Sequence, residues 1–363
     1  ALAETDLNVV AATIEAELEA SRAAGVPVER AVQPPDLGSP VAGAIVLAGQ
    51  AQFDPVPYLA GLADAVAAAG GHVHEQTRVV AVDRVSRGDG ATLQDLGRAG
   101  QAHLGVPRSG ALDEGAHRLA NRLVGNPESA ATLETTLTGV RVTFDQHVVI
   151  AVTGAQCPVR IGDRLVGFAA AQHVLAGEPV TLGPSLQARS YLAIAGGVDT
   201  PMDLGSRATD LLSGLGTPPL AAGQMLPIGN RWQQPSYVDT GGALSAPGTV
   251  LRVVPGPRAD WFTPDSLITL AGANYRVQAQ SNRIGLRLAG PVLNRVKHAE
   301  LPSEPVVLGA VQVPPDGQPM VFLNDHPTTG GYPVIGVVHP EDLRNCAQAR
   351  PGDTLGFRLQ DSP

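Results

Sequence analysis

The spacing of apolar positions changes near residue 90. Before that point, apolar residues recur at helical intervals over residues 7–24 and 55–69, and a short apolar run at 42–47 predicts a strand. Gly25 follows the first helical pattern, and Gly70-Gly71 follows the second. Helices and strands that alternate in this way predict a short α/β segment at the start of the chain.

After residue 90, short apolar runs separated by turn residues dominate. Turn signals such as Gly162-Asp163 and Asp316-Gly317 divide these runs, and only residues 113–123 show a clear helical pattern, with Asp113 as its cap and Gly125 at its end. A second short helix is expected near residues 341–349. The strand-length runs lie at 147–152, 191–195, 250–254, 304–308, 320–323 and 334–338. This pattern predicts a mainly β protein.

Composition supports a folded chain with more than one domain. The chain has 363 residues, of which 44% are hydrophobic and 16% charged. Residues 234–248 are rich in proline and glycine and are predicted to separate two β-rich halves. We therefore predict an α/β segment at 1–88, one β-rich domain at 89–240 and a second at 249–363.

Charge and hydropathy exclude several classes of protein. The net charge is −9, and the sequence has no cluster of basic residues of the kind that nucleic-acid binding requires. No apolar run is long enough to predict a membrane span, and no basic signal-peptide region is seen, so a cytoplasmic protein is expected. Lys297 is the one lysine and precedes His298, so neither a phosphate-binding P-loop nor a biotin-carrying lysine motif is present. Cys157 and Cys346 show no zinc or redox spacing, which predicts buried thiols and no metal site.

A polar segment follows the apolar run at 320–323. Asn324, Asp325 and His326 come first, and Thr328-Thr329-Gly330-Gly331-Tyr332 follows. His326 is a candidate for proton transfer near neutral pH, with Asp325 to orient it or act as base. The two glycines allow a ligand to approach the backbone, so residues 328–332 are candidate substrate contacts. The alternative is that Asp325 and the threonines only stabilise a tight turn.

Two arginines are the next candidates. In a strand, Arg283, Gly285 and Arg287 share one face, so both guanidinium groups could bind one carboxylate. The alternative is a solvated strand face. Gln312, which precedes a proline-flanked Asp316-Gly317 turn, is a candidate contact for a substrate amide, although the strong turn signal favours an architectural role for this segment.

A polar cluster lies near the start of the β-rich region. Gln94, Asp95 and Arg98 are candidates to line a cleft between the halves, with Gln94 and Asp95 predicted to bind substrate. Asp113 and Ser109 are predicted to cap the following helix and its loop instead. A purely structural role for the whole cluster is the alternative.

Several short motifs follow one another in a recognisable order. They lie at 92–98, 103–107, 109–113, 120–126, 133–134, 193–197, 204–207, 256–257, 260–262, 281–288, 312–319 and 328–333. Through them, residues 91–358 resemble the allophanate hydrolase subunit 2 family, which is also called the KipA family and includes the C subunit of 5-oxoprolinase.

The resemblance implies a fold and a function. It implies a cyclophilin-like β-barrel in the C-terminal half. It also implies a subunit of an ATP-dependent 5-oxoprolinase that acts with an allophanate hydrolase subunit 1-like protein (the B subunit of 5-oxoprolinase) and a LamB/YcsF-type subunit, with ATP at an interface between partners. Among relatives, the alternatives are a biotin-dependent carboxyltransferase of the urea amidolyase type, with biotin on a partner, and a regulatory binding module of the KipA type.

The first residues carry a different resemblance. Residues 43–79 are similar to the middle of FAD-dependent amino-acid-oxidase-type oxidoreductases. The Gly-x-Gly-x-x-Gly fingerprint that cradles a pyrophosphate is absent, so FAD binding is not expected. Our hypothesis is a truncated fusion joined near residues 83–90, in which residues 79–85 supply the first strand of the β-rich region.

Overall fold

The structure is a computed structural model that describes residues 28–31, 44–47, 78–85, 90–230 and 247–360, together with Glu19 and Arg22. The chain forms two compact units, Ala1–Glu75 and Gln76–Pro363. In the first unit, β1 (Val28–Ala31) pairs antiparallel with β2 (Ala44–Leu47), which matches the strand predicted at 42–47. The helices predicted at 7–24 and 55–69 lie outside the described residues, apart from Glu19 and Arg22, which are helical.

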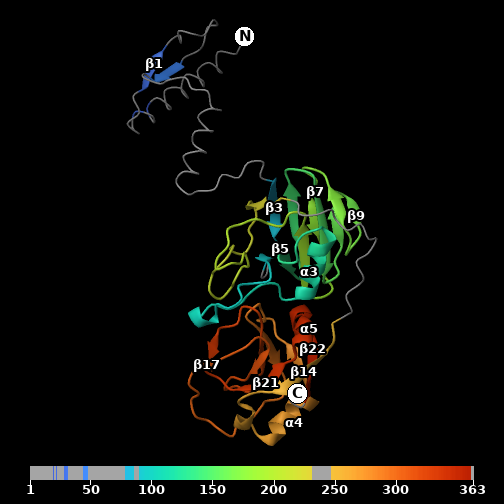
Figure 1. The fold of residues 1–363 in the computed structure, drawn as a ribbon, viewed down its shortest axis with the longest axis vertical. Helices are drawn as coiled ribbons and strands as arrows, with labels where there is room; N and C mark the ends of the chain where they lie inside the picture. The colour runs from blue at the N-terminus through green and yellow to red at the C-terminus, as the bar shows by residue number, and fades with distance from the viewer. Residues whose placement is uncertain are drawn as a thin grey trace. The chain divides into compact units, whose positions relative to one another are not determined.

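The first half of the second unit contains two β-sheets (Figure 1). One sheet has the order β10-β7-β12-β5-β4, and the other has the order β13-β3-β6-β11-β8-β9. The strands of the first are β4 (Ala91–Gln94), β5 (Thr132–Thr136), β7 (Val148–Gly154), β10 (Gln172–Val174) and β12 (Arg189–Ile194). The strands of the second are β3 (Arg78–Val85), β6 (Val140–Phe144), β8 (Val159–Ile161), β9 (Arg164–Val166), β11 (Val180–Leu182) and β13 (Met225–Ile228).

The first sheet is buried on both faces. Ile150 of β7 packs in the core between the two sheets, whereas its neighbours Val149 and Ala151 pack against α3 (Glu114–Leu123) on the opposite face. Successive strand residues point to opposite faces, so a strand covered on both sides is apolar throughout. This explains why residues 147–152 form a continuous apolar run instead of an alternating one.

Strand β3 joins the β-rich half and not the first unit. It pairs antiparallel with β6 and with β13, and the boundary between the compact units precedes it at Gln76. Its buried residues Val80 and Val82 belong to the core between the sheets. The hypothesis that residues 79–85 supply the first strand of the β-rich region is thereby confirmed.

The second half is a closed barrel with the order β14-β21-β18-β19-β16-β15-β22. A parallel pairing of β14 with β22 closes it. Its strands are β14 (Val250–Pro255), β15 (Asn274–Val277), β16 (Gly285–Ala289), β18 (Ala310–Gln312), β19 (Met320–Phe322), β21 (Val334–Val338) and β22 (Thr354–Leu359). A short pairing of β17 (Glu304–Pro305) with β20 (Thr329–Gly330) lies beside it.

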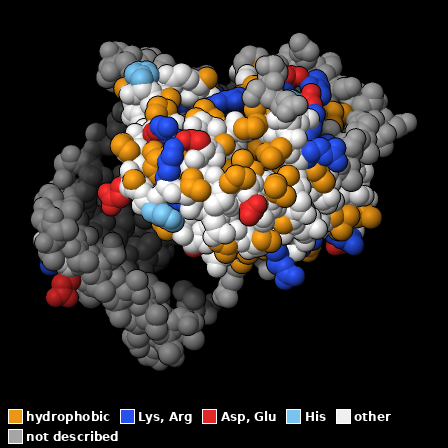
Figure 2. Space-filling view, turned by 90° about the horizontal axis from the view of Figure 1, so that it is seen from below, with side chains coloured by type: hydrophobic (Ala, Val, Ile, Leu, Met, Phe, Trp, Pro, Cys, Tyr) orange, Lys and Arg blue, Asp and Glu red, His pale blue; other side chains and the backbone are white. Residues whose placement is uncertain are grey.

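Apolar side chains fill the barrel. Leu251, Leu288 and Val321 are fully buried in its core, and Leu270 of α4 (Pro264–Gly272) and Cys346 of α5 (Leu343–Gln348) join them. Figure 2 shows apolar side chains spread over the barrel end of the molecule among few charged ones. Scattered exposure of this kind is normal for a folded domain.

The mainly β fold and the C-terminal barrel are confirmed. Five of the six predicted strand runs correspond to β7, β12, β14, β19 and β21, whereas in the run at 304–308 only the two residues of β17 are a strand. The predicted helices correspond to α3 and to α5 with the short 3-10 helix η3 (Pro340–Asp342), but α4 was not predicted. Two other 3-10 turns are η1 (Ala102–Leu104) and η2 (Ala259–Trp261). Among the described residues, no helix has the length and apolarity that a bilayer crossing requires.

A buried histidine fixes α3 to the first sheet. His117 is fully buried and donates from Nε2 to the Glu128 carbonyl oxygen at 2.9 Å, while its Nδ1 lies 2.9 Å from Thr132 Oγ1. Burial lowers the pKa of His117 from 6.5 to about 4, because the charged ring would lose its hydration. The folded protein therefore holds this ring neutral over a range of pH in which the unfolded chain protonates it.

This difference predicts a loss of stability in mild acid. Stability from neutral His117 is complete above pH 6.5 and falls as the pH drops towards 4, since only the unfolded chain gains the proton. A shift of about 2.5 pH units at about 1.36 kcal/mol each corresponds to about 3 kcal/mol in total. Urea denaturation at pH values from 7.5 to 5 should show a steeper loss for the wild type than for His117→Gln.

The exposed His103 provides the control. His103→Gln changes an exposed side chain, so its free energy of unfolding should fall between pH 6.5 and 5 as steeply as that of the wild type. Most carboxylates are ionised in the folded and the unfolded chain over this range and contribute little to the slope. An equal slope for wild type and His117→Gln would contradict the assignment.

Candidate functional site

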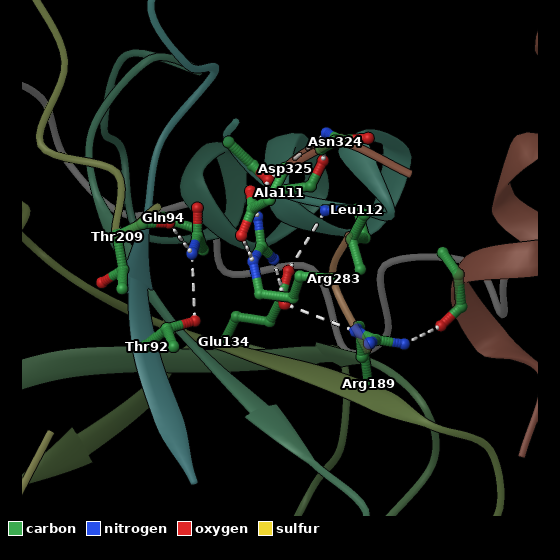
Figure 3. Close-up of polar contacts among 12 residues, drawn as sticks. Thr92, Gln94, Ala111, Leu112, Glu134, Arg189, Thr209, Arg283, Asn324 and Asp325 are labelled. Atoms are coloured by element: carbon green, nitrogen blue, oxygen red, sulfur yellow. Dashed lines mark hydrogen bonds and ion pairs between the residues drawn. The ribbon is translucent and has the colours of Figure 1, made fainter. Parts of the chain in front are cut away.

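The two β-rich halves meet at a buried polar layer, which we call the polar seam. Arg283, just before β16, crosses from the barrel into the first half and is 2% exposed. Its Nε donates to Asp325 Oδ2 at 3.0 Å, its Nη2 to Asp325 Oδ1 at 3.1 Å and to the Gly110 carbonyl at 2.6 Å, and its Nη1 to Glu134 Oε1 (Figure 3). The seam consists of buried polar and charged side chains that are connected across the two halves, namely Ser109, Asp113, Glu134, Arg189, Arg283, Asn324, Asp325 and Gln348.

Glu134 is the carboxylate on the opposite side of the seam. It extends from β5, and its Oε2 accepts hydrogen bonds from the Tyr191 hydroxyl at 2.7 Å and from the Leu112 amide at 3.1 Å. Burial alone would raise the pKa of Glu134, but Arg283 and Arg189 outweigh it and leave the pKa below its ordinary value. Glu134 is thus an ionised carboxylate in a fully buried position.

Asp325 is equally buried, and hydrogen bonds occupy both of its oxygens. Besides Arg283, the Ser109 hydroxyl donates to Oδ1 at 2.6 Å and the Leu211 amide donates to Oδ2 at 3.1 Å. The neighbouring Asn324 donates from Nδ2 to the carbonyl oxygens of residues 109–111. The Asn324-Asp325 pair therefore joins the barrel to the loop between β4 and α3.

These contacts correct two predictions. Arg283 precedes its strand and is buried in the seam, whereas Arg287 lies on the exposed face of β16, so the two arginines do not form one carboxylate site. Asp325 accepts hydrogen bonds from Arg283 and Ser109 and makes none with His326, so it does not orient that ring. The shared arginine site and the Asp325–His326 pair were wrong because sequence spacing cannot show which partner a side chain reaches across a domain interface.

His326 lies at the edge of the seam with 9% of its surface exposed. Its Nδ1 is 2.7 Å from the Pro327 carbonyl oxygen, so Nδ1 carries the proton and Nε2 keeps the lone pair. Burial lowers the pKa of His326 below its ordinary value. His326 is consequently neutral near pH 7 and capable of accepting a proton at Nε2.

The other predicted substrate contacts of the barrel form a separate group. Gln312 is buried and donates from Nε2 to the Tyr332 carbonyl at 3.1 Å, and it packs so closely on Gly330 that a Cβ there would lie 2.6 Å from Nε2. Thr329 and Gly330 are paired in β20, and Gly331 and Tyr332 are exposed. Thr328 accepts the Val306 amide through its carbonyl. The structure thus brings Gln312 to the 328–332 segment.

The predicted cluster in the first half divides as well. Gln94 is fully buried and donates from Nε2 to Thr92 Oγ1 and to the Thr209 carbonyl, both at 3.0 Å (Figure 3). Asp113 caps α3 by accepting the Ala116 amide, as predicted, while Ser109 binds Asp325 instead of the helix. Among Gln94, Asp95 and Arg98, the side chain that lines a cavity is Asp95.

That cavity, which we call the glycine cleft, has a volume of about 580 Å³. Asp95, the glycines 97, 196, 197, 205 and 229, and Arg207 contribute to its lining, and Val198 and Met202 supply apolar surface. Cavities of about 300–1,000 Å³ are typical of small-molecule sites. The glycine cleft is therefore a candidate ligand site within the first half of the second unit.

A braced loop forms one wall of the glycine cleft. Arg98 is buried beneath it and donates from Nε to the Asp203 carbonyl at 3.3 Å and from Nη2 to the Ala208 carbonyl at 2.6 Å. Asp95 holds the same loop from the other side, because its carboxylate accepts the Ser206 hydroxyl at 2.6 Å and the Arg207 amide at 2.7 Å. Arg98 supports this wall but does not line the cleft.

Glu134, Arg189 and Arg207 were not predicted as site residues. For Glu134 and Arg207 a signal was present, since they belong to the family motifs at 133–134 and 204–207. Arg189 carried no such signal. Both cysteines are buried and unpaired, as predicted, and burial raises the pKa of Cys346 to about 12. Among the described residues, no three metal-ligating side chains converge on one point.

Comparison with known proteins adds to this geometry. The sequence pattern of the family described as carboxyltransferase domain, subdomain A and B, matches residues 104–359. The chain belongs to this family. A second pattern, described as FAD dependent oxidoreductase, matches residues 3–106, which agrees with the resemblance seen at the start of the chain.

Individual proteins are similar to most of this chain. The chain is 40% identical to the C subunit of 5-oxoprolinase from Escherichia coli over 270 residues, which are 73% of this chain and 87% of that protein. The crystal structure of TTHA0988 matches with a TM-score of 0.70 at 33% identity over 79% of this chain. The K. lactis urea amidolyase matches with a TM-score of 0.72 at 26% identity over 88% of this chain. The chain spans 57% of TTHA0988 and 21% of the amidolyase.

The ion pairs of the polar seam are expected to contribute to the stability of the folded chain. Arg283→Ala should lower the free energy of unfolding by about 3–5 kcal/mol, because it leaves Glu134 and Asp325 buried without their shared cation. Arg283→Lys keeps the charge but loses the forked geometry, so it should fall between alanine and wild type. Urea denaturation at pH 7 measures both.

Arg287→Ala is the matched control. The side chain lies on the exposed face of β16, so the change should alter stability by less than about 0.5 kcal/mol. Similar small losses for Arg283→Ala and Arg287→Ala would refute a central role for the seam.

Proposed function

We propose that this chain is a subunit of an ATP-dependent 5-oxoprolinase, which converts 5-oxoproline, ATP and water to glutamate, ADP and phosphate. The supporting observation is the 40% identity to the C subunit of 5-oxoprolinase from Escherichia coli over 87% of that protein. A second protein of the same name, from Haemophilus influenzae, is 34% identical over the same share of its length. Likeness over nearly the whole relative supports a shared role more strongly than likeness to one part of a long enzyme.

The geometry is compatible with a small substrate. The glycine cleft has a suitable volume, and Arg283 of the polar seam holds the loop beside it by a hydrogen bond to the Gly110 carbonyl. Lys297, the one lysine, precedes His298 and pairs with Asp260. This chain therefore supplies no P-loop lysine for ATP. We place ATP at an interface with the partner subunits, an allophanate hydrolase subunit 1-like protein and a LamB/YcsF-type protein.

Carboxyl transfer is the second candidate. It is favoured by the likeness to K. lactis urea amidolyase, which covers 88% of this chain. Because Lys297 is the one lysine of the chain and does not lie in a biotin-carrying motif, biotin would have to arrive on a partner protein. In this case activity would depend on urea and on the biotinylated partner, and avidin would abolish it.

The reaction itself is the first test. The chain mixed with the two other 5-oxoprolinase subunits of the same genome should release ADP and glutamate in equal amounts when 5-oxoproline is added. Omitting the chain should reduce ADP release to the background, because the complex is then incomplete. Coupled detection of ADP, together with amino-acid analysis for glutamate, measures both products.

The controls separate the candidates. L-proline has the ring and the carboxylate but no lactam, so it should give no ADP release above background. Release of ADP that does not depend on this chain would contradict the proposal. Turnover of urea with a biotinylated partner would favour carboxyl transfer, whereas a chain that binds its partners without effect on any turnover would favour a regulatory module.

A further inference from the structure

The carboxylate of Asp95 has one acceptor position left over. Oδ1 accepts the Gly97 amide at 2.7 Å and the Ser206 hydroxyl at 2.6 Å, and Oδ2 accepts the Arg207 amide at 2.7 Å. An ionised carboxylate can accept about four hydrogen bonds. Among the contacts of the described residues, a position on Oδ2 is therefore open, and Asp95 lines the glycine cleft.

Arg207 complements this acceptor on the same wall. Its Nε donates to the Thr200 carbonyl at 2.7 Å, and its Nη2 pairs with Asp199 Oδ1 at the rim. These contacts hold one edge of the guanidinium and leave Nη1 without a hydrogen bond in the described part of the chain. The side chain is 20% exposed, so it is partly screened from water yet accessible to a ligand. A guanidinium in this setting suits a carboxylate.

The rest of the cleft suits a compact ring. Val198, Ala131 and Met202 provide apolar surface. Gly205 adopts φ +82°, which favours a glycine. A Cβ at this position would meet nothing within 4 Å, so packing does not require a glycine there. The volume of about 580 Å³ leaves room for a ligand beside Asp95 and Arg207, which both line the cleft.

We propose that the glycine cleft binds a small cyclic amide that carries a carboxylate beside its N–H, the class to which 5-oxoproline belongs. Asp95 Oδ2 accepts the ring N–H, Arg207 binds the carboxylate, and Met202 covers the ring methylenes. The assignment rests on the proposed function for its choice of substrate. It also distinguishes this substrate from urea, which has no carboxylate for Arg207 and no methylene groups.

The test compares two ligands that differ in one group. Ligand-observed NMR titration of the full chain with L-5-oxoproline and with 2-pyrrolidinone, which lacks the carboxylate, gives the two dissociation constants. Arg207→Gln should weaken 5-oxoproline binding at least tenfold and leave pyrrolidinone binding unchanged. Met202→Trp should weaken both, because the indole fills the cleft while Met202, 54% exposed, takes part in no polar contact there.

Controls keep loss of binding separate from loss of fold. Arg160→Gln removes an exposed arginine outside the cleft, so this variant should bind 5-oxoproline as the wild type does. Each variant should keep the melting temperature of the wild type to within about 2 °C. No binding of 5-oxoproline to the wild type, or full binding by Arg207→Gln and Met202→Trp, overturns the assignment.

The two proposals can fail separately. If the reconstituted complex releases ADP with 5-oxoproline but Arg207→Gln and Met202→Trp keep the wild-type KM, the proposed function stands and the cleft assignment falls. If the complex is inactive with 5-oxoproline while Arg207→Gln still abolishes binding of the acid alone, the proposed function falls and the cleft remains a site for this ligand class.

Discussion

The buried guanidinium of Arg283 is the interaction on which the arrangement of the two β-rich halves depends. It lies between Glu134 of the first half and Asp325 of the barrel, and all three side chains are almost completely removed from water. Burying such charges costs several kcal/mol per ion unless they are paired and hydrogen-bonded. An arrangement of the halves that separated these three groups would leave a buried charge unpaired, so the ion pairs favour the arrangement seen here.

The same contacts extend from the seam to the glycine cleft. Arg283 binds the Gly110 carbonyl, and Gly110 packs on Gly97 so closely that a Cβ would lie 2.7 Å from the Gly97 amide nitrogen. Asp95 accepts that same amide and also holds the loop that carries Arg207. A cleft within one half is thus tied to the domain interface by short polar contacts, and this is how a rigid scaffold positions binding groups.

Local signals in the sequence predicted local features well. Asp113 followed by an amphipathic run indicated α3 and its cap, and continuous apolar runs indicated β7 and β21. Helix α4 was overlooked although Thr263-Pro264 is a strong start signal, because the helix is short and its apolar residues do not share one face: Leu270 is buried whereas Ile268 is exposed. The candidate residues were mostly found as well, but their partners were not.

The sequence by itself determined the mainly β fold, the place of the barrel, the strand at 79–85 and the family. Each of these depends on patterns within a few residues or on an ordered series of motifs. Only the tertiary structure decided that Arg283 is buried and Arg287 exposed, and that Asp95 lines a cleft while Gln94 does not. The physical reason is that a charged side chain is buried only where the fold supplies a partner of opposite charge. Here the two partners are 149 positions apart in the chain.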